Sequence, residues 1–264
     1  MLQVVKTYLK FLLKSTNQHG VHSPFVFELV TKCFYDKKKY TEYNLLKNHR
    51  KKLLENKESI EITDFGAGSK IFKSNLRAIN KMVENSGISP KRSRLLFRLV
   101  KYFKPSNILE LGTHLGLSTV ALHLGHADAS VVTVEGCENT LNVAKHEFEA
   151  SFGKGVTFIN SDFDTYLKNT DFSYLKENKN HWNLVYFDGN HSKEATERYV
   201  EHLLPTVTNQ TLWVFDDIHW TKEMEETWEN IKKRPEVTVT IDTFQWGIVF
   251  FRKEQVKEHF TIRV

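Results

Sequence analysis

From Asn107 onward the sequence alternates short β-branched runs with helical patterns, and this alternation constrains the fold more than any other feature. Such spacing is typical of strand–helix units repeated in a parallel sheet. The runs predict strands at 107–111, 130–135, 156–161, 183–188, 211–216, 237–244 and 247–251. The gaps predict helices near 117–125, 138–151, 192–203 and 221–233. Only Gln245 and Trp246 separate the last two strands, so these strands should pair antiparallel.

The predicted fold class is therefore α/β: a Rossmann-like, doubly wound, mostly parallel seven-stranded sheet whose last strand is antiparallel. The first hundred residues differ, because their apolar positions recur at helical spacing with Lys and Arg interleaved. Residues 70–87 follow the same helical pattern. We expect residues 1–86 to form an N-terminal helical cap or accessory segment, and residues 87–264 to form the main domain.

Composition narrows the setting of the protein. Cys33 and Cys137 are too few for a disulfide framework and lie outside any zinc-ligand spacing, which indicates a reducing, cytoplasmic compartment. Lysines interrupt the apolar N-terminal run, and no stretch reaches the roughly 18 apolar residues of a membrane span. Lys and Arg are in excess before Pro105, and acids are in excess after it. The basic part could attract an anionic substrate, nucleic acid or a membrane surface, or it could be solvated helix faces.

Two glycine loops compete for the role of cofactor loop. Residues 62–69, ITDFGAGS, are followed only by helical patterns, whereas residues 108–118, ILELGTHLGLS, are followed by a helix and then by a strand ending in Glu135. A ligand in a doubly wound sheet lies across the carboxyl ends of adjacent strands, so the second loop is the predicted site. It contains Gly112 and Gly116 but not the third glycine or the lysine of phosphate-binding loops. A cofactor without phosphates is therefore favoured over NAD or ATP.

Acidic residues stand at or next to the ends of the first five predicted strands: Glu110, Glu135, Asp162, Asp188 and Asp216. The carboxyl ends of parallel strands form the edge at which open sheets bind ligands. Because grouped carboxylates repel one another, a cationic group should lie among them. S-adenosylmethionine meets these requirements, since it carries a sulfonium, an ammonium group, a ribose diol and an adenine amine, and no phosphate.

Each acid of the first three strands has a predicted partner on this cofactor. Glu110 would hold the methionyl ammonium, directly or through water, Glu135 would accept both ribose hydroxyls, and Asp162 would accept from the adenine amino group. An ordinary helix N-cap is the alternative role for each acid. Gly112 and Gly116 would let the backbone approach the ligand. The predicted cofactor-binding residues are Glu110, Gly112, Thr113, Gly116, Ser118, Glu135, Gly136, Asp162, Phe163 and Asp188.

The chain resembles the class I S-adenosylmethionine-dependent methyltransferases, and within them it is similar to the small-molecule O-methyltransferases of the catechol and caffeoyl-CoA type. The resemblance spans about Ser89 to Phe251 and centres on the Leu-Glu-x-Gly-x-x-x-Gly-x-Ser loop at 109–118. It implies a seven-stranded sheet with the final strand reversed, S-adenosylmethionine as cofactor, and a methyltransferase domain at 87–264. The implied reaction is O-methylation of a small hydroxylated acceptor.

The same resemblance implies a metal site at the later strand ends. These relatives hold a divalent cation with an Asp after the fourth strand and an Asp-Asn pair after the fifth. The corresponding residues are Asp188, Asp216 and Asp217, with Asp217 in place of the Asn. Oxygen ligands of this kind suit Mg²⁺, so metal assistance is one prediction and a metal-free reaction is the alternative.

Residues at and just after these acids are the candidates for activating the acceptor. His191 stands where the relatives have a catalytic lysine, and a histidine can act as a base near neutral pH. Asp188 and His191 are therefore the predicted catalytic residues, and capping of the helix at 192–203 is the alternative role of His191. His219 and Trp220 are candidates for lining the acceptor pocket, or they are ordinary loop residues.

Other functions remain open at this point. One alternative is an RNA methyltransferase whose basic N-terminal segment grips phosphates, although no RNA-binding signature is present. Another is a non-catalytic protein that keeps the fold, since fold alone does not establish chemistry. The assembly could be a homodimer. The segments 18–27 and 62–69 could cap the acceptor, or they could be a rigid scaffold.

Overall fold

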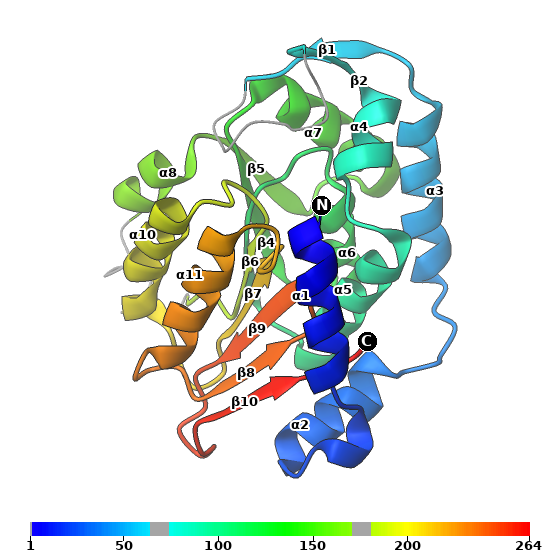
Figure 1. Cartoon of the computed structure of the whole chain (residues 1–264). Helices are drawn as coiled ribbons and strands as arrows, with labels where there is room; N and C mark the ends of the chain where they lie inside the picture. Colours follow the sequence, from blue (N-terminus) through cyan, green and yellow to red (C-terminus); the bar gives the residue numbers. More distant parts are fainter. Residues whose placement is uncertain (1, 64–73, 171–180) are drawn as a thin grey trace. The chain divides into compact units, whose positions relative to one another are not determined.

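The computed structural model describes residues 2–63, 74–170 and 181–264. Its backbone contacts form two compact units, which we call the terminal unit, Met1–Tyr35 with Leu167–Val264, and the central unit, Asp36–Tyr166. The elements of both are labelled in Figure 1. The predicted domain division at residues 86 and 87 stays a prediction. None of the helices in the described ranges is both long enough and apolar enough to cross a membrane.

Among the described residues, the central unit contains three parallel strands in the order β3-β4-β5. The strands are β3 Asn107–Leu111, β4 Ser130–Glu135 and β5 Val156–Asn160, and the helices that follow them are α6 Leu117–Gly125, α7 Glu138–Phe152 and α8 Phe163–Asn169. Leu111 lies opposite Val134, and Glu135 lies opposite Asn160. The carboxyl ends of β3 and β4 are therefore neighbours, which places the glycine loop next to Glu135.

Helices also precede these strands in the central unit. They are α3 Glu42–Glu55, α4 Ile79–Ser86 and α5 Pro90–Phe103, and two short strands, β1 Ser59–Glu61 and β2 Leu76–Ala78, pair antiparallel. α5 begins where the Ser89 hydroxyl accepts from the Arg92 N–H, and its C-cap residue, Lys104, adopts a left-handed backbone. The helix expected over 70–87 begins only at Ile79, because residues 76–78 pair as a strand.

The terminal unit contributes the remaining described strands, in the order β10-β8-β9-β7-β6. Its strands are β6 Leu184–Phe187, β7 Leu212–Asp216, β8 Val239–Asp242, β9 Trp246–Phe250 and β10 Glu258–Thr261, and its later helices are α10 Lys193–Leu203, η3 Leu204–Thr206 and α11 Lys222–Lys233. β9 runs antiparallel to both β7 and β8, which confirms the predicted reversal. β10 was not predicted, because Glu258 and His259 are exposed and give it the pattern of a surface loop.

The N-terminal residues pack within the terminal unit. They form α1 Leu2–Lys14, η1 Gln18–Gly20, α2 Pro24–Leu29 and η2 Val30–Phe34. The backbone N–H of Thr16 donates to the Thr261 carbonyl at 2.9 Å. The Phe25 ring meets the Phe250 ring of β9 edge-on, with 5.0 Å between centroids. Part of the segment 18–27 thus packs against a strand of this unit, as a scaffold would.

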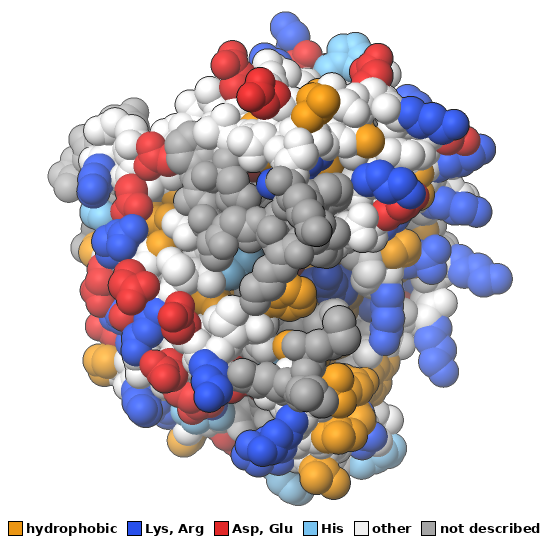
Figure 2. All heavy atoms as spheres, turned by 45° about the horizontal axis from the view of Figure 1, so that its top comes forward, with side chains coloured by type: hydrophobic (Ala, Val, Ile, Leu, Met, Phe, Trp, Pro, Cys, Tyr) orange, Lys and Arg blue, Asp and Glu red, His pale blue; other side chains and the backbone are white. Residues whose placement is uncertain are grey.

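The basic excess of the early sequence is visible on α3. Lys47, Lys51 and Lys52 of this helix are exposed. Figure 2 shows Lys and Arg side chains gathered on the right, the side of the molecule on which α3 lies. One of these lysines is paired along the helix, since Lys51 Nζ lies 3.5 Å from Glu55 Oε1. This face of the central unit therefore carries positive charge at the surface.

Candidate functional site

The loop after β3 depends on its two glycines. Gly112 has a φ of 113° and Gly116 a φ of 76°, backbone values that residues with a Cβ rarely adopt. The Gly112 N–H donates to the Val134 carbonyl at 3.0 Å, so the loop is fastened to the end of β4. A Cβ at Gly116 would also lie only 3.2 Å from the Ala144 Cβ on α7. The loop is consequently compact, and α6 begins directly after Gly116.

The Glu135 carboxylate is held beside this loop by two backbone groups. Its Oε2 accepts from the His114 N–H at 2.9 Å, and its Oε1 accepts from the Cys137 N–H at 2.9 Å. The result is a half-buried, oriented pair of acceptors at the carboxyl end of β4.

His114 is a loop residue that the sequence reasoning missed. Its backbone is left-handed, with a φ of 48°. Burial, and then the Arg77 charge, lower the pKa of its imidazole to about 4. The ring is therefore neutral near pH 7 and adds no positive charge beside the loop.

Glu110 lies beneath the loop and has no exposed surface. Its Oε2 accepts from the Thr119 hydroxyl at 2.5 Å and from the Thr133 hydroxyl at 2.7 Å. Its Oε1 has no partner among the described residues. Burial raises the pKa of this carboxyl to about 7, against hydrogen bonds from Ser118 and the two threonines.

The hydroxyl network continues to Thr113, whose Oγ1 lies 2.5 Å from that of Thr133. Thr113 and Ser118 were predicted as cofactor-binding residues, and both side chains are buried in this network. Glu110 and the glycine loop could be predicted from the sequence, but the hydroxyl groups on β4 and α6 that surround Glu110 could not. These buried hydrogen bonds hold the glycine loop in place.

The predicted adenine-side residues lie after β5. Asp162 Oδ1 accepts from the Thr165 N–H at 2.8 Å, so Asp162 caps the start of α8, and this backbone hydrogen bond lowers its pKa. Its second oxygen remains available as an acceptor by chemistry. Phe163, the first residue of α8, and Gly136 are half-buried. The Asn160 amide ties this region to β4 by donating to the Gly136 carbonyl at 3.1 Å.

The rival glycine segment lies near the same strand end. The Asn139 side-chain amide donates to the Glu61 carbonyl at 2.8 Å, and the Thr63 N–H points at Cys137 Sγ at 3.4 Å. β1 therefore ends beside the first turn of α7, two residues from Glu135. The glycines at 66 and 68 lie outside the described residues.

In the terminal unit, Asp188 and His191 face each other after β6. Asp188 Oδ1 lies 4.0 Å from His191 Nε2, and both side chains are about one quarter exposed, at 24% and 26%. Asn190 between them has a left-handed backbone with a φ of 46°. The pair is accessible, and the carboxylate is close enough to stabilise positive charge on the imidazole.

The acids after β7 have different surroundings. Asp216 is 5% exposed, its Oδ1 accepts from the Asp217 N–H at 2.9 Å, and its Oδ2 lies 3.5 Å from the Tyr186 hydroxyl. Asp217 has a φ of 54°. In the part of the chain that the structure describes, no three His, Cys, Asp or Glu side chains form a group that could hold a metal. Asp188, Asp216 and Asp217 therefore do not form such a group of three, and a metal role for any of them stays a prediction.

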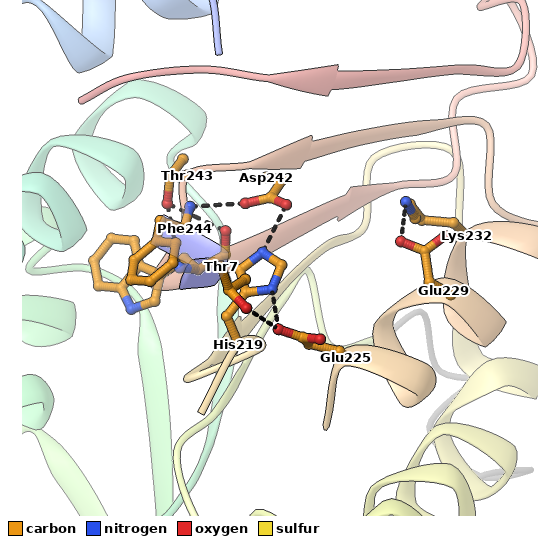
Figure 3. Close-up of polar contacts among 9 residues, drawn as sticks. Thr7, His219, Glu225, Glu229, Lys232, Asp242, Thr243 and Phe244 are labelled. Atoms are coloured by element: carbon orange, nitrogen blue, oxygen red, sulfur yellow. Dashed lines mark hydrogen bonds and ion pairs between the residues drawn. The ribbon is translucent and has the colours of Figure 1, made fainter. Parts of the chain in front are cut away.

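His219 is the centre of a polar cluster shown in Figure 3. Its Nε2 lies 2.8 Å from Asp242 Oδ2, and its Nδ1 lies 3.5 Å from Glu225 Oε1. The Thr7 hydroxyl of α1 donates to that same Glu225 oxygen at 2.9 Å. The imidazole thus joins the loop after β7 to β8, to α11 and, through Glu225, to α1.

An aromatic group covers this cluster. The Phe244 ring stacks on the His219 ring at 5.3 Å, and it contacts the rings of Tyr8 at 4.8 Å and Phe11 at 5.5 Å. Phe244 has a φ of 74°, a strained value for an aromatic residue, and its N–H donates to Asp242 Oδ1 at 2.7 Å. Such strain is often found at functional sites. His114, Asn190, Asp217 and Phe244 all combine positive φ with a position just after a strand.

The chain resembles known methyltransferases in part of its sequence and in its fold. Residues 109–218 match the family model of a methyltransferase domain. A search of curated protein sequences gives no significant match. Among solved structures, the SAH-bound Podospora anserina methyltransferase PaMTH1 is similar over 88% of this chain and 97% of that chain, with 14% identity and a TM-score of 0.60.

Two further structures show the same likeness. The Streptomyces achromogenes O-methyltransferase TomG, in complex with SAM, is similar over 84% of this chain and 95% of that chain, with 15% identity and a TM-score of 0.56. A Bacillus cereus O-methyltransferase in complex with SAH is similar over 83% and 95%, with 16% identity and a TM-score of 0.53. At such identities the likeness is one of fold, and the predicted Rossmann-like α/β class is confirmed. Residues 109–218 are similar in sequence to a methyltransferase domain, in line with the predicted resemblance.

Proposed function

We propose that this methyltransferase uses S-adenosylmethionine to methylate a hydroxyl oxygen of a small acceptor. The observation that carries the proposal is the Glu135 carboxylate, whose two oxygens are oriented by the His114 and Cys137 N–H groups beside the glycine loop. Two fixed acceptors suit the adjacent hydroxyls of a ribose. PaMTH1 and the Bacillus cereus enzyme are bound to SAH, and TomG is bound to SAM, which supports the same cofactor here.

The remaining cofactor contacts follow from the strand ends. The loop backbone at Gly112 and Gly116 would lie against the methionyl part, and Glu110 would act on its ammonium group through water while supporting the loop with Thr113 and Ser118. Gly136 and Phe163 would flank the ribose and adenine, and the second oxygen of Asp162 would accept from the adenine amine. The predicted cofactor role of Asp188 stays a prediction. A phosphate-bearing cofactor is disfavoured, because Glu135 would repel it.

The proposed reaction needs one base and one aligned nucleophile. A lone pair of the acceptor oxygen attacks the methyl carbon, the carbon–sulfur bond breaks, and sulfur keeps the electron pair as a neutral thioether. The acceptor proton passes to His191, and Asp188 stabilises the imidazolium that forms. Holding the acceptor in line with the methyl group supplies much of the remaining acceleration.

Metal assistance by Mg²⁺ is a second way to activate the acceptor, since a bound divalent ion would lower the pKa of the hydroxyl. In the described part of the chain Asp188, Asp216 and Asp217 are not gathered into one group of ligands. We expect the initial rate to be unchanged in EDTA. A rate that falls in EDTA and returns with Mg²⁺ would assign acceptor activation to a metal held by these acids.

The acceptor itself can be found by screening. Small phenols, catechols and aliphatic alcohols would be tested for release of S-adenosylhomocysteine, with and without Mg²⁺. We expect turnover on a hydroxylated small molecule that is insensitive to salt. Turnover on RNA that falls steeply with salt would instead support the RNA methyltransferase alternative, for which the exposed lysines of α3 are the only specific observation in the described residues. Cofactor binding without turnover on any acceptor would support a non-catalytic protein.

A further inference from the structure

The central unit contains a cavity that the proposed reaction does not use. It has a volume of about 210 Å³ and lies among residues of α3, α5 and α6. None of the residues that line it belongs to the proposed cofactor, catalytic or metal sets. We call it the α3–α5 cavity.

The body of the α3–α5 cavity is apolar. Leu46 of α3, Ile88 before α5, and Leu117 and Val120 of α6 contribute to its lining, and all four are buried. An apolar protein cavity of about 150 Å³ can hold benzene, so this one can hold an apolar group of about eight heavy atoms. Its size thus suits a single ring or a short alkyl chain.

Cationic side chains also line the cavity. Lys47 of α3 and Arg94 of α5 belong to the lining and are exposed, so they stand where the cavity meets solvent. The Arg94 guanidinium lies over the Tyr43 ring, 5.1 Å from its centroid, which orients it. None of the described lining residues is acidic. Positive charge without a lining carboxylate favours an anionic group at the opening.

Arg50 adds a third positive charge deeper in the lining. Its Nη1 donates to the Ile88 carbonyl at 2.7 Å, and its Nη2 donates to the Val83 carbonyl at 3.0 Å. These bonds hold the guanidinium in place and connect α3 to the segment before α5. Arg50 is therefore both structural and a fixed source of positive potential.

His49 is a second, independent feature of the lining that points to a ligand. It lines the cavity and is 3% exposed, yet neither ring nitrogen has a hydrogen-bond partner among the described residues. Buried polar groups are normally satisfied, and each exception needs a reason. Burial lowers the pKa of this imidazole to about 4, so it offers one donor and one acceptor as a neutral ring.

We propose that the α3–α5 cavity is a binding site for a small amphipathic monoanion, whose apolar tail or ring fills the cavity and whose carboxylate or phosphate head lies at Lys47 and Arg94. An occupant would contact Leu117, the residue that follows Gly116 of the glycine loop. The site is therefore separate from the cofactor residues but adjoins the helix on which their loop depends.

The test uses the full-length protein and octanoate, a monoanion with a short alkyl chain, in calorimetric titrations without any methyl donor. Octylammonium, which has an alkyl tail of similar size and the opposite charge, is the ligand control. We expect octanoate to bind with a stoichiometry of one, and octylammonium to bind at least about tenfold more weakly. Equal affinities, or no octanoate binding, would overturn the proposal.

Matched variants locate the site. Reversing both charges in Lys47→Glu/Arg94→Glu should weaken octanoate binding at least about tenfold, because both cations stand at the opening. The control Lys51→Glu/Lys91→Glu makes the same charge change on the same two helices outside the cavity lining, and its octanoate affinity should stay within about threefold of the wild type. Equal losses in the two double variants would contradict the assignment.

A third variant fills the cavity without changing charge. Ser93 of α5 lines the cavity and is 8% exposed, so Ser93→Leu should occupy the space of the alkyl chain and abolish octanoate binding. Full affinity in a folded Ser93→Leu protein would place octanoate elsewhere. If that variant does not fold, the paired charge variants still decide. Since no methyl donor is present, the result does not depend on the proposed methyl transfer.

Discussion

The loop after β3 and the loop after β7 are both held by buried or half-buried carboxylates, but their partners come from very different distances along the chain. At the first loop, the hydrogen bonds from Thr119 to Glu110, from Thr133 to Glu110 and from His114 to Glu135 span 9, 23 and 21 residues. At the second, the Thr7–Glu225 bond that completes the His219 cluster spans 218 residues.

The loop after β3, the proposed cofactor loop, is therefore held by residues of one strand–helix–strand unit, β3–α6–β4. The His219 cluster, in contrast, also depends on Thr7 of the N-terminal helix α1. Substitutions at the loop after β3 should therefore affect cofactor binding. Substitutions in the loops of the terminal unit should affect turnover or stability and leave cofactor affinity unchanged. Mutations in either region test whether the two regions act separately.

The largest effect is expected at His191. His191→Gln should lower kcat about 10²- to 10⁴-fold, because the base for the acceptor proton is lost. Affinity for S-adenosylhomocysteine should change little. His202→Gln, on the helix α10 that follows His191, is the matched control and should keep both values. A His191→Gln enzyme with normal kcat would show that another group removes the proton.

Glu110, beneath the loop after β3, should make the free energy of unfolding depend on pH. Because the folded-state pKa of its carboxyl is about 7, above the ordinary 4.5, the folded protein holds the proton more tightly than the unfolded chain. The wild type should therefore lose stability relative to Glu110→Gln as pH rises from 4.5 through 7, by on the order of 3 kcal/mol. Urea unfolding of both proteins from pH 5 to pH 8 measures this, and parallel curves would contradict it.

A smaller effect is expected at the second loop. His219→Ala should lower the free energy of unfolding by about 1–3 kcal/mol, since Asp242 Oδ2 loses its imidazole partner. His259→Ala is the control, because His259 is an exposed residue of β10 that contacts the Thr240 hydroxyl of β8. Cofactor affinity should be unchanged in both. A large loss of affinity in His219→Ala would show that the two loops are coupled.

Much of the fold could be predicted because its signals are local. β3 and β4 have the predicted bounds, and α6 does too, because β-branched runs and helical spacing are read over a few residues. α8 was missed, since it has seven residues and its capping Asp162 was assigned to a ligand. β1 and β2 were missed because their pairing joins residues on either side of 62–75.

The candidate site divides along the same line. The strand-end acids and the glycines were visible in the sequence, because their order along the chain fixes their place at the sheet edge. The His219 cluster was not visible, because no local pattern links Thr7 to Glu225 or His219 to Asp242. The α3–α5 cavity was also invisible, since Lys47 and Arg94 lie on different helices and only tertiary packing puts both in one lining.

The most direct test of the central claim is a calorimetric titration of S-adenosylhomocysteine into the wild type, Glu135→Ala and the exposed control Glu138→Ala. Loss of two hydrogen bonds to a charged group, each worth about 1.5–3 kcal/mol, should weaken binding at least about 100-fold in Glu135→Ala. Glu138→Ala should match the wild type. Wild-type protein that does not bind, or Glu135→Ala that binds as tightly as the wild type, would contradict the assignment of the glycine loop and Glu135 as the cofactor site.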